Sequence, residues 1–189
     1  PVNIYYTHPS GTAGGGVAFR PLLVGSTIIS VSMPGFTSAI NSGARTVNVI
    51  QPSISLTTNY PTIGSGLQEG GFGNLGASQH GGVTVTLTSS DSTILLLAPN
   101  ATTPGSGSIQ IVLANGQTGF SFTAAGLEGI SNTTTVTITA VASGFTNGTV
   151  GVSVDRPAVE LQGLSTGAYT AGGPDVNFYA QIGLPNVQN

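Results

Sequence analysis

The sequence predicts an all-β protein made of antiparallel β-sandwiches in tandem. Apolar and polar residues alternate over residues 83–88, and a period of two places one set on a buried face and the other in water. The same alternation returns at residues 120–123, 136–140 and 150–154, each time after Gly, Asn or Ser residues that can turn the chain. Residues 81–157 are therefore expected to be a run of antiparallel strands.

An internal repeat connects the two ends of the chain. Residues 26–37, STIISVSMPGFT, resemble residues 135–146, TVTITAVASGFT. Both segments are expected to be strands that end in a Gly-Phe-Thr corner. Repetition of one strand and its corner indicates that the chain contains more than one copy of the same kind of domain.

Two prolines mark the expected domain junctions. Residues 44–56, ARTVNVIQPSISL, align with residues 150–161, VGVSVDRPAVEL, and the alignment matches Pro52 with Pro157. Proline has no amide with which to continue a β-ladder, so a proline after a terminal strand fits a domain boundary.

These junctions divide the chain into three segments. Residues 53–157 have the length of a seven-stranded sandwich of about 100 residues and are expected to form a complete domain. Residues 1–52 resemble the second half of that domain. Residues 158–189 resemble its first half, with residues 174–184 aligned to residues 81–91.

Each outer segment is too short to form a sandwich alone. We expect residues 158–189 to be completed by residues 1–52, either of the next unit or of the same chain. In the first arrangement, units are joined in a continuous polypeptide or exchange strands by strand complementation. In the second arrangement, the chain is a compact two-domain monomer.

Three motifs of the middle segment are similar to those of bacterial immunoglobulin-like repeats of the invasin/intimin type, known as Big-like repeats. They are V-x-L-x-S-S-(D/N) at residues 85–91, G-Q-T-x-x-x-F at residues 116–122, and T-x-T-I-T-A-x-x-x-G-(F/Y) at residues 135–145. The resemblance implies tandem immunoglobulin-like sandwiches with Greek-key connections in a secreted or cell-surface protein. The chain departs from the family in the long, Gly-rich region at residues 53–82.

Composition argues against several classes of partner. Only 5% of residues are charged and lysine is absent, so no basic stripe can form and nucleic acid is not an expected partner. The chain has no cysteine and therefore no thiolate metal site. No run approaches the roughly 18 apolar residues of a membrane span, so none is expected.

No catalytic or cofactor site is expected. Neither His8 nor His80 lies near a cluster of acidic residues, and the spacing suggests no pairing of a histidine with an acid. Residues 71–76 match G-x-G-x-x-G, but a strand is expected after them instead of a helix, so we interpret them as a loop. We therefore do not expect an enzyme.

Calcium is a metal to consider in a tandem sandwich, because it can stiffen the joints between domains. Asp155 and Glu160, with Asp91, are the acids that could gather near the second junction. The first junction, at residues 50–53, contains no acid. A repeated calcium joint is therefore not expected.

Three sequons, at Asn100, Asn132 and Asn147, lie in expected turns and are candidate glycosylation sites. The expected function is that of a structural repeat unit of an extracellular filament, stalk or surface fibre, assembled head-to-tail, with neighbouring units and laterally bundled filaments as partners. The alternative is an adhesin module whose tip loops, at residues 60–82, contact a glycan.

Overall fold

The computed structural model describes residues 2–4, 17–37 and 43–184. All regular elements in these residues are β-strands and none is a helix, which confirms the predicted all-β class. The chain separates into two compact units, Pro1–Gln51 and Pro52–Asn189.

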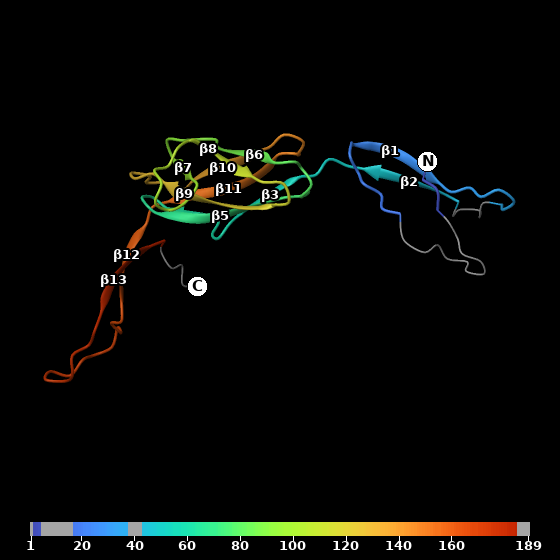
Figure 1. Ribbon diagram of the computed structural model, residues 1–189. Helices are drawn as coiled ribbons and strands as arrows, with labels where there is room; N and C mark the ends of the chain where they lie inside the picture. Colours follow the sequence, from blue (N-terminus) through green and yellow to red (C-terminus); the bar gives the residue numbers. More distant parts are fainter. Residues whose placement is uncertain (1, 5–16, 38–42, 185–189) are drawn as a thin grey trace. The chain divides into compact units, whose positions relative to one another are not determined.

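A two-layer sandwich occupies most of the second unit (Figure 1). One sheet has four strands in the order β3 (Ile54–Thr58), β5 (Gln68–Leu75), β9 (Gly119–Gly126) and β7 (Leu95–Ala98). The other has five strands in the order β4 (Thr62–Gly64), β11 (Gly148–Asp155), β10 (Thr134–Val141), β6 (Val83–Ser89) and β8 (Ser108–Leu113). Neighbouring strands are antiparallel except β4, which runs parallel to β11.

Alternate residues of both sheets meet in one hydrophobic core. Leu75 and Leu97 come from the four-stranded sheet, and Val85, Ile138 and Val152 come from the five-stranded sheet; all five are fully buried. The alternation predicted for residues 83–88 is thus confirmed. Burying each such side chain contributes roughly 1.5–3 kcal/mol to folding.

The interpretation of residues 71–76 as a loop is wrong, because most of them lie in β5. Gly71 faces Phe122 across the β5–β9 ladder and Gly73 faces Phe120. A Cβ atom on either glycine would collide with the facing phenylalanine ring. The glycines are therefore required where the two rings lie across the neighbouring strand.

Two further sheets have only two strands each. The first unit contains the antiparallel pair β1 (Gly25–Ser30) and β2 (Ala44–Val49), and the second contains β12 (Ala158–Gln162) and β13 (Tyr179–Gly183). We call these pairs the N-terminal ribbon and the C-terminal ribbon. Within the part of the chain that the structure describes, no third strand joins either ribbon. Two-stranded sheets are marginally stable in water unless they pack against something else.

Candidate functional site

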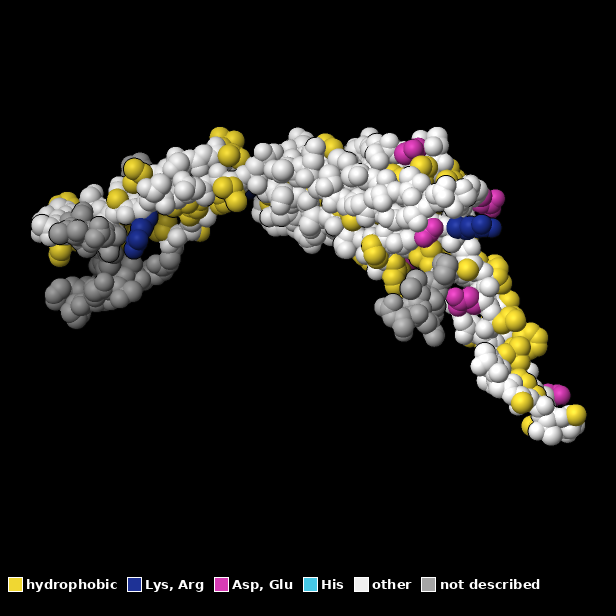
Figure 2. All heavy atoms as spheres, turned by 180° about the vertical axis from the view of Figure 1, so that it is seen from behind, with side chains coloured by type: hydrophobic (Ala, Val, Ile, Leu, Met, Phe, Trp, Pro, Cys, Tyr) yellow, Lys and Arg dark blue, Asp and Glu magenta, His cyan; other side chains and the backbone are white. Residues whose placement is uncertain are grey.

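The C-terminal ribbon has one apolar face and one polar face. Val159 pairs with Ile182, and Leu161 pairs with Ala180, on the apolar face. Val159 is 69% exposed, and Leu161 and Ile182 are each 62% exposed. Figure 2 shows hydrophobic side chains gathered along this ribbon, whereas few hydrophobic or charged side chains appear on the visible face of the sandwich.

The opposite face of the C-terminal ribbon carries the pairs Glu160 with Gln181 and Gln162 with Tyr179. A sheet that is apolar on one side and polar on the other normally packs its apolar side against a second layer. The C-terminal ribbon is therefore a candidate binding surface for another sheet.

The N-terminal ribbon also presents apolar side chains on one face. Thr27 pairs with Val47, and Ile29 pairs with Arg45, while Val49 extends the same face. Ile29 remains 44% exposed, and the two valines are half-buried. This ribbon is thus a second candidate surface of the same type.

The N-terminal ribbon reproduces the pairing of β10 with β11. In the sequence repeat, residues 25–30 correspond to residues 134–139, and residues 44–49 correspond to residues 149–154. Gly25 pairs with Val49, and their counterparts Thr134 and Val154 pair with each other. The two hairpins therefore share one register.

The corner after the first strand is also shared by these hairpins. Gly35 has a φ of 82° and its counterpart Gly144 has a φ of 83°. In each corner, the amide of the residue after the glycine donates to the carbonyl of the residue two positions before the glycine, at 3.1 Å and 3.2 Å respectively. The resemblance of the two sequences thus extends to the geometry of the backbone.

The C-terminal ribbon is an antiparallel pair, as are β3 and β5. Ile54 pairs with Leu75 in the sandwich, and Val159 pairs with Ile182 in the ribbon. By its place in the pair β13 corresponds to β5, whereas the sequence aligns residues 174–184 with residues 81–91, which contain β6. Alternation alone does not distinguish two strands of similar length.

A matching turn precedes the second strand in each of these pairs. Gly66 and Gly172 both have a φ of 77°. In each turn, the amide of the residue after the glycine donates to the carbonyl of the residue two positions before the glycine, at 2.9 Å and 3.0 Å. The C-terminal ribbon therefore resembles the beginning of the sandwich in its antiparallel pairing and in turn geometry.

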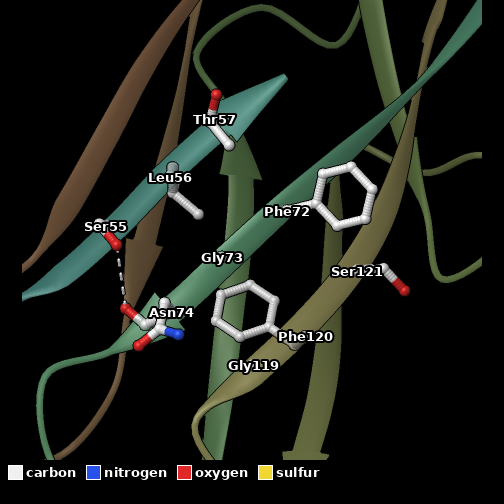
Figure 3. Close-up of a pocket in the computed structure, with 9 residues that line it drawn as sticks. All are labelled: Ser55, Leu56, Thr57, Phe72, Gly73, Asn74, Gly119, Phe120 and Ser121. Carbon is white, nitrogen blue, oxygen red and sulfur yellow. Dashed lines mark hydrogen bonds between the residues drawn. The ribbon is translucent and has the colours of Figure 1, made fainter. Parts of the chain in front are cut away.

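An open hollow of about 540 Å³ lies on the four-stranded sheet (Figure 3). Its lining includes Phe72, which is 50% exposed, and Asn74, whose carbonyl accepts a hydrogen bond from Ser55 Oγ at 3.4 Å. Leu56, Thr57, Gly73, Gly119, Phe120 and Ser121 complete the lining. The combination of an exposed ring and hydroxyl groups can bind the face of a sugar.

The three sequon asparagines are exposed and lie in connections between strands. Asn100 follows β7, Asn132 precedes β10, and Asn147 lies directly before β11. The side-chain oxygen of Asn100 accepts hydrogen bonds from the amides and hydroxyls of Thr102 and Thr103, at 2.9–3.0 Å. These bonds give the Asn100 turn a fixed conformation.

The junction prolines lie on either side of the sandwich strands. The carbonyl of Pro52 accepts a hydrogen bond from the amide of Thr146 at 2.8 Å, next to the start of β11. Pro157 lies between the end of β11 and the start of β12. The chain therefore enters and leaves the sandwich at opposite ends of β11.

The acids considered for calcium form local hydrogen bonds instead of a cluster. Asp155 accepts from the Arg156 amide at 2.7 Å, and Glu160 accepts from Gln162 at 3.2 Å. The hydroxyl and the amide of Thr93 donate to Asp91 and lower the pKa of its carboxyl below the ordinary value of 3.8. The described residues contain no group of three or more potential metal ligands from His, Cys, Asp and Glu.

His80 contacts other residues of the sandwich through both a hydrogen bond and its ring. Its Nε2 lies 2.8 Å from the Gln117 carbonyl, and its ring meets the edge of Phe145 at a centroid distance of 6.1 Å. His8 lies outside the described residues. Sequence reasoning found the repeated segments but missed the faces of the ribbons, which depend on the register of each pair.

Among the residues placed by the structure there is no helix with the length and apolar character needed to cross a membrane. No family model matches the chain, and the curated proteins include no significant match to it.

Proposed function

We propose that this chain is a structural repeat unit of an extracellular filament, stalk or surface fibre, assembled head-to-tail from immunoglobulin-like domains. The observation that carries the proposal is the register that the N-terminal ribbon shares with the β10–β11 hairpin. A complete sandwich is flanked by pieces that resemble its end and its beginning. Such a chain is suited to serial assembly, because each joint can complete another sandwich.

The strand order supports the immunoglobulin-like part of the proposal. Immunoglobulin sandwiches pair their seven strands as A-B-E-D and C-F-G. The order β3-β5-β9-β7 corresponds to A-B-E-D, and β6-β10-β11 corresponds to C-F-G. With this assignment the letters A to G follow the order of the strands along the chain. Strands β4 and β8 then extend the second sheet at its two edges.

Low charge supports the fibre role. Because only 5% of residues are charged, little electrostatic repulsion opposes the lateral packing of filaments. Location outside the cell rests on the resemblance of the motifs to those of secreted and surface repeats, together with the lysine-free, Gly-rich composition.

Negative-stain electron microscopy of the native material and of the concentrated chain tests this function. We expect filaments that bundle laterally and whose bundling changes little with salt, since screening acts only on charged groups. A field of dispersed single molecules at every concentration would contradict the proposal.

A second candidate is an adhesin or carbohydrate-binding module, and the hollow at Phe72 is the observation that favours it. The expectation that residues 60–82 form a tip loop is wrong, because all of β4 and β5 lie there as strands. A glycan array with the intact chain and with Phe72→Ala separates the two functions. Glycan binding that is lost in Phe72→Ala favours the adhesin, whereas no binding favours the fibre.

A further inference from the structure

We infer that the apolar face of the C-terminal ribbon binds the N-terminal ribbon of a second copy of the chain, and that the two ribbons close a composite sandwich. The inference rests on the proposed function and identifies the surfaces through which the copies join. Each ribbon then acquires the layer that its counterpart already has in the sandwich.

The faces of the ribbons correspond to faces that pack together in the sandwich. Val159 aligns in sequence with Ile54, and its partner Ile182 takes the place of Leu75, the partner of Ile54; Ile54 and Leu75 are 4% and 1% exposed in the core. The same apolar positions thus lie open in the C-terminal ribbon.

The N-terminal ribbon provides the opposing layer. Val47 and Val49 are the counterparts of Val152 and Val154, which are fully buried in the sandwich core. One ribbon therefore supplies the apolar positions of the beginning of a sandwich, and the other supplies those of its end.

A close backbone approach in the sandwich adds a second, independent observation. The amide of Ile54 donates to the carbonyl of Thr146 at 3.0 Å, so the start of β3 runs beside the start of β11. A Cβ atom on Gly148 would lie 2.5 Å from the carbonyl oxygen of Ile54. Glycine is therefore needed at the position where β3 passes.

The N-terminal ribbon keeps this glycine. Gly43 is the counterpart of Gly148. Its carbonyl accepts a hydrogen bond from the Val31 amide at 2.9 Å, and at the corresponding position of the sandwich Ala140 pairs with Gly148. The strand that passes Gly148 is β3, and its counterpart is β12. We therefore expect Val159 of one copy to run beside Gly43 of the next.

Geometry favours a second copy over closure within one chain. The eight residues of β11 separate the two junctions by about 25 Å at about 3.3 Å per residue. The N-terminal ribbon connects to the sandwich at one of these junctions and the C-terminal ribbon at the other, so a second copy can bring the two kinds of ribbon together at a single joint.

Paired variants of the full chain test the interface by sedimentation velocity across a wide range of concentration. Ile182→Asp blocks the C-terminal face, and Gln181→Asp on the other face is its matched control. Val47→Asp blocks the N-terminal face, with Asn48→Asp as its control. We expect each face variant to weaken association by at least about 100-fold, because a buried carboxylate without a partner is strongly unfavourable.

Mixing the two face variants gives the sharper result. Ile182→Asp retains an intact N-terminal face and Val47→Asp retains an intact C-terminal face, so the mixture should form a one-to-one dimer and nothing longer. Both control variants should assemble like the unmodified chain. Circular dichroism and the unfolding midpoint of the sandwich should be unchanged in all four variants, because none of these residues belongs to its core.

Three results would overturn the inference: an unmodified chain that stays monomeric, an Ile182→Asp chain that assembles normally, or a Val47→Asp chain that dimerises alone through its C-terminal ribbon. The proposed function is judged separately by microscopy. Filaments that persist in Ile182→Asp would support the fibre role and contradict this interface. Head-to-tail dimers without filaments would support the interface and contradict the fibre role.

Discussion

Single glycines determine how the aromatic residues of the sandwich are packed. Phe120 lies across Gly73 of the adjacent strand, and the residue is only 8% exposed, so its ring has little room to move. We expect Gly73→Ala to lower the free energy of unfolding by about 1–3 kcal/mol, because the added methyl group must displace a packed ring.

The matched control for this variant is Gly119→Ala in the neighbouring strand, where a Cβ atom has no heavy atom within 4 Å. Its free energy of unfolding should stay within about 0.5 kcal/mol of the unmodified chain. Urea denaturation followed by circular dichroism measures both variants. Equal stabilities of the two variants would show that the ring does not depend on the glycine.

The pKa of Asp91 is a second property fixed by one neighbour. Thr93 donates its hydroxyl to Asp91 Oδ1 at 2.6 Å and its amide at 2.9 Å, and these bonds favour the ionised carboxylate. Thr93→Val removes the stronger of these effects and should raise the pKa of Asp91 toward 3.8, whereas Thr93→Ser should preserve the lowered value. NMR titration of the Asp91 carboxyl carbon measures the change.

The sign of the associated stability follows from linkage. Because the pKa of Asp91 is lower in the folded state, the ionised carboxylate stabilises the fold above the unfolded pKa near 3.8, and this contribution is lost as the pH falls through the folded pKa. Thr93→Val should therefore show a smaller loss of stability in acid than the unmodified chain. An unchanged acid profile would contradict this account.

The role of Gly71 and Gly73 could not be predicted from the sequence. Their Gly-rich segment suggests a loop when it is considered alone, because glycine weakens strands. The reason for glycine is supplied by Phe120 and Phe122, which are distant in sequence and adjacent only across the ladder. No local pattern contains that pairing.

At the scale of elements, the repeated corner of the hairpins depends on a left-handed glycine. Gly144 has a φ of 83° and open space around its missing side chain, so any cost of substitution comes from the backbone alone. We expect Gly144→Ala to lower the free energy of unfolding by about 1–2 kcal/mol. Gly144→Asn should cost less, because asparagine adopts this conformation more readily. Thermal unfolding of both variants tests the order.

The strands of the sandwich differ in how clearly the sequence predicts them. Alternation predicts β6, β10 and β11, because each has one buried and one exposed face. It aligns residues 174–184 with β6, although these residues alternate like several strands. The pairing of β12 with β13 adds what alternation lacks, since it fixes which side chains share a face.

At the scale of the whole molecule, the sequence repeat predicted that the two ends resemble parts of one domain. It did not predict that the C-terminal ribbon would carry a nearly uniform apolar face, because that face combines residues of two strands separated by a long connection. Nor did it predict the hollow at Phe72, which depends on the arrangement of three strands. The candidate surfaces are thus properties of pairing more than of composition.

The stability of the chain should therefore be uneven, and hydrogen exchange can measure this. Strands β6 and β10 lie within the sandwich and share its core, so their amides should exchange slowly at every concentration. The ribbons β1–β2 and β12–β13 have two strands each and should open readily in dilute solution.

In concentrated solution, docking of a second copy should slow exchange of the ribbon amides by at least about tenfold, because opening then requires the joint to break. Gln181→Asp should show the same protection, whereas Ile182→Asp should lose it in β12 and β13 without any change in β6 or β10. Ribbon amides that are already protected in the dilute monomer would show that the chain closes on itself. In that case the compact two-domain arrangement, and not the joint between copies, would account for the repeated segments at its ends.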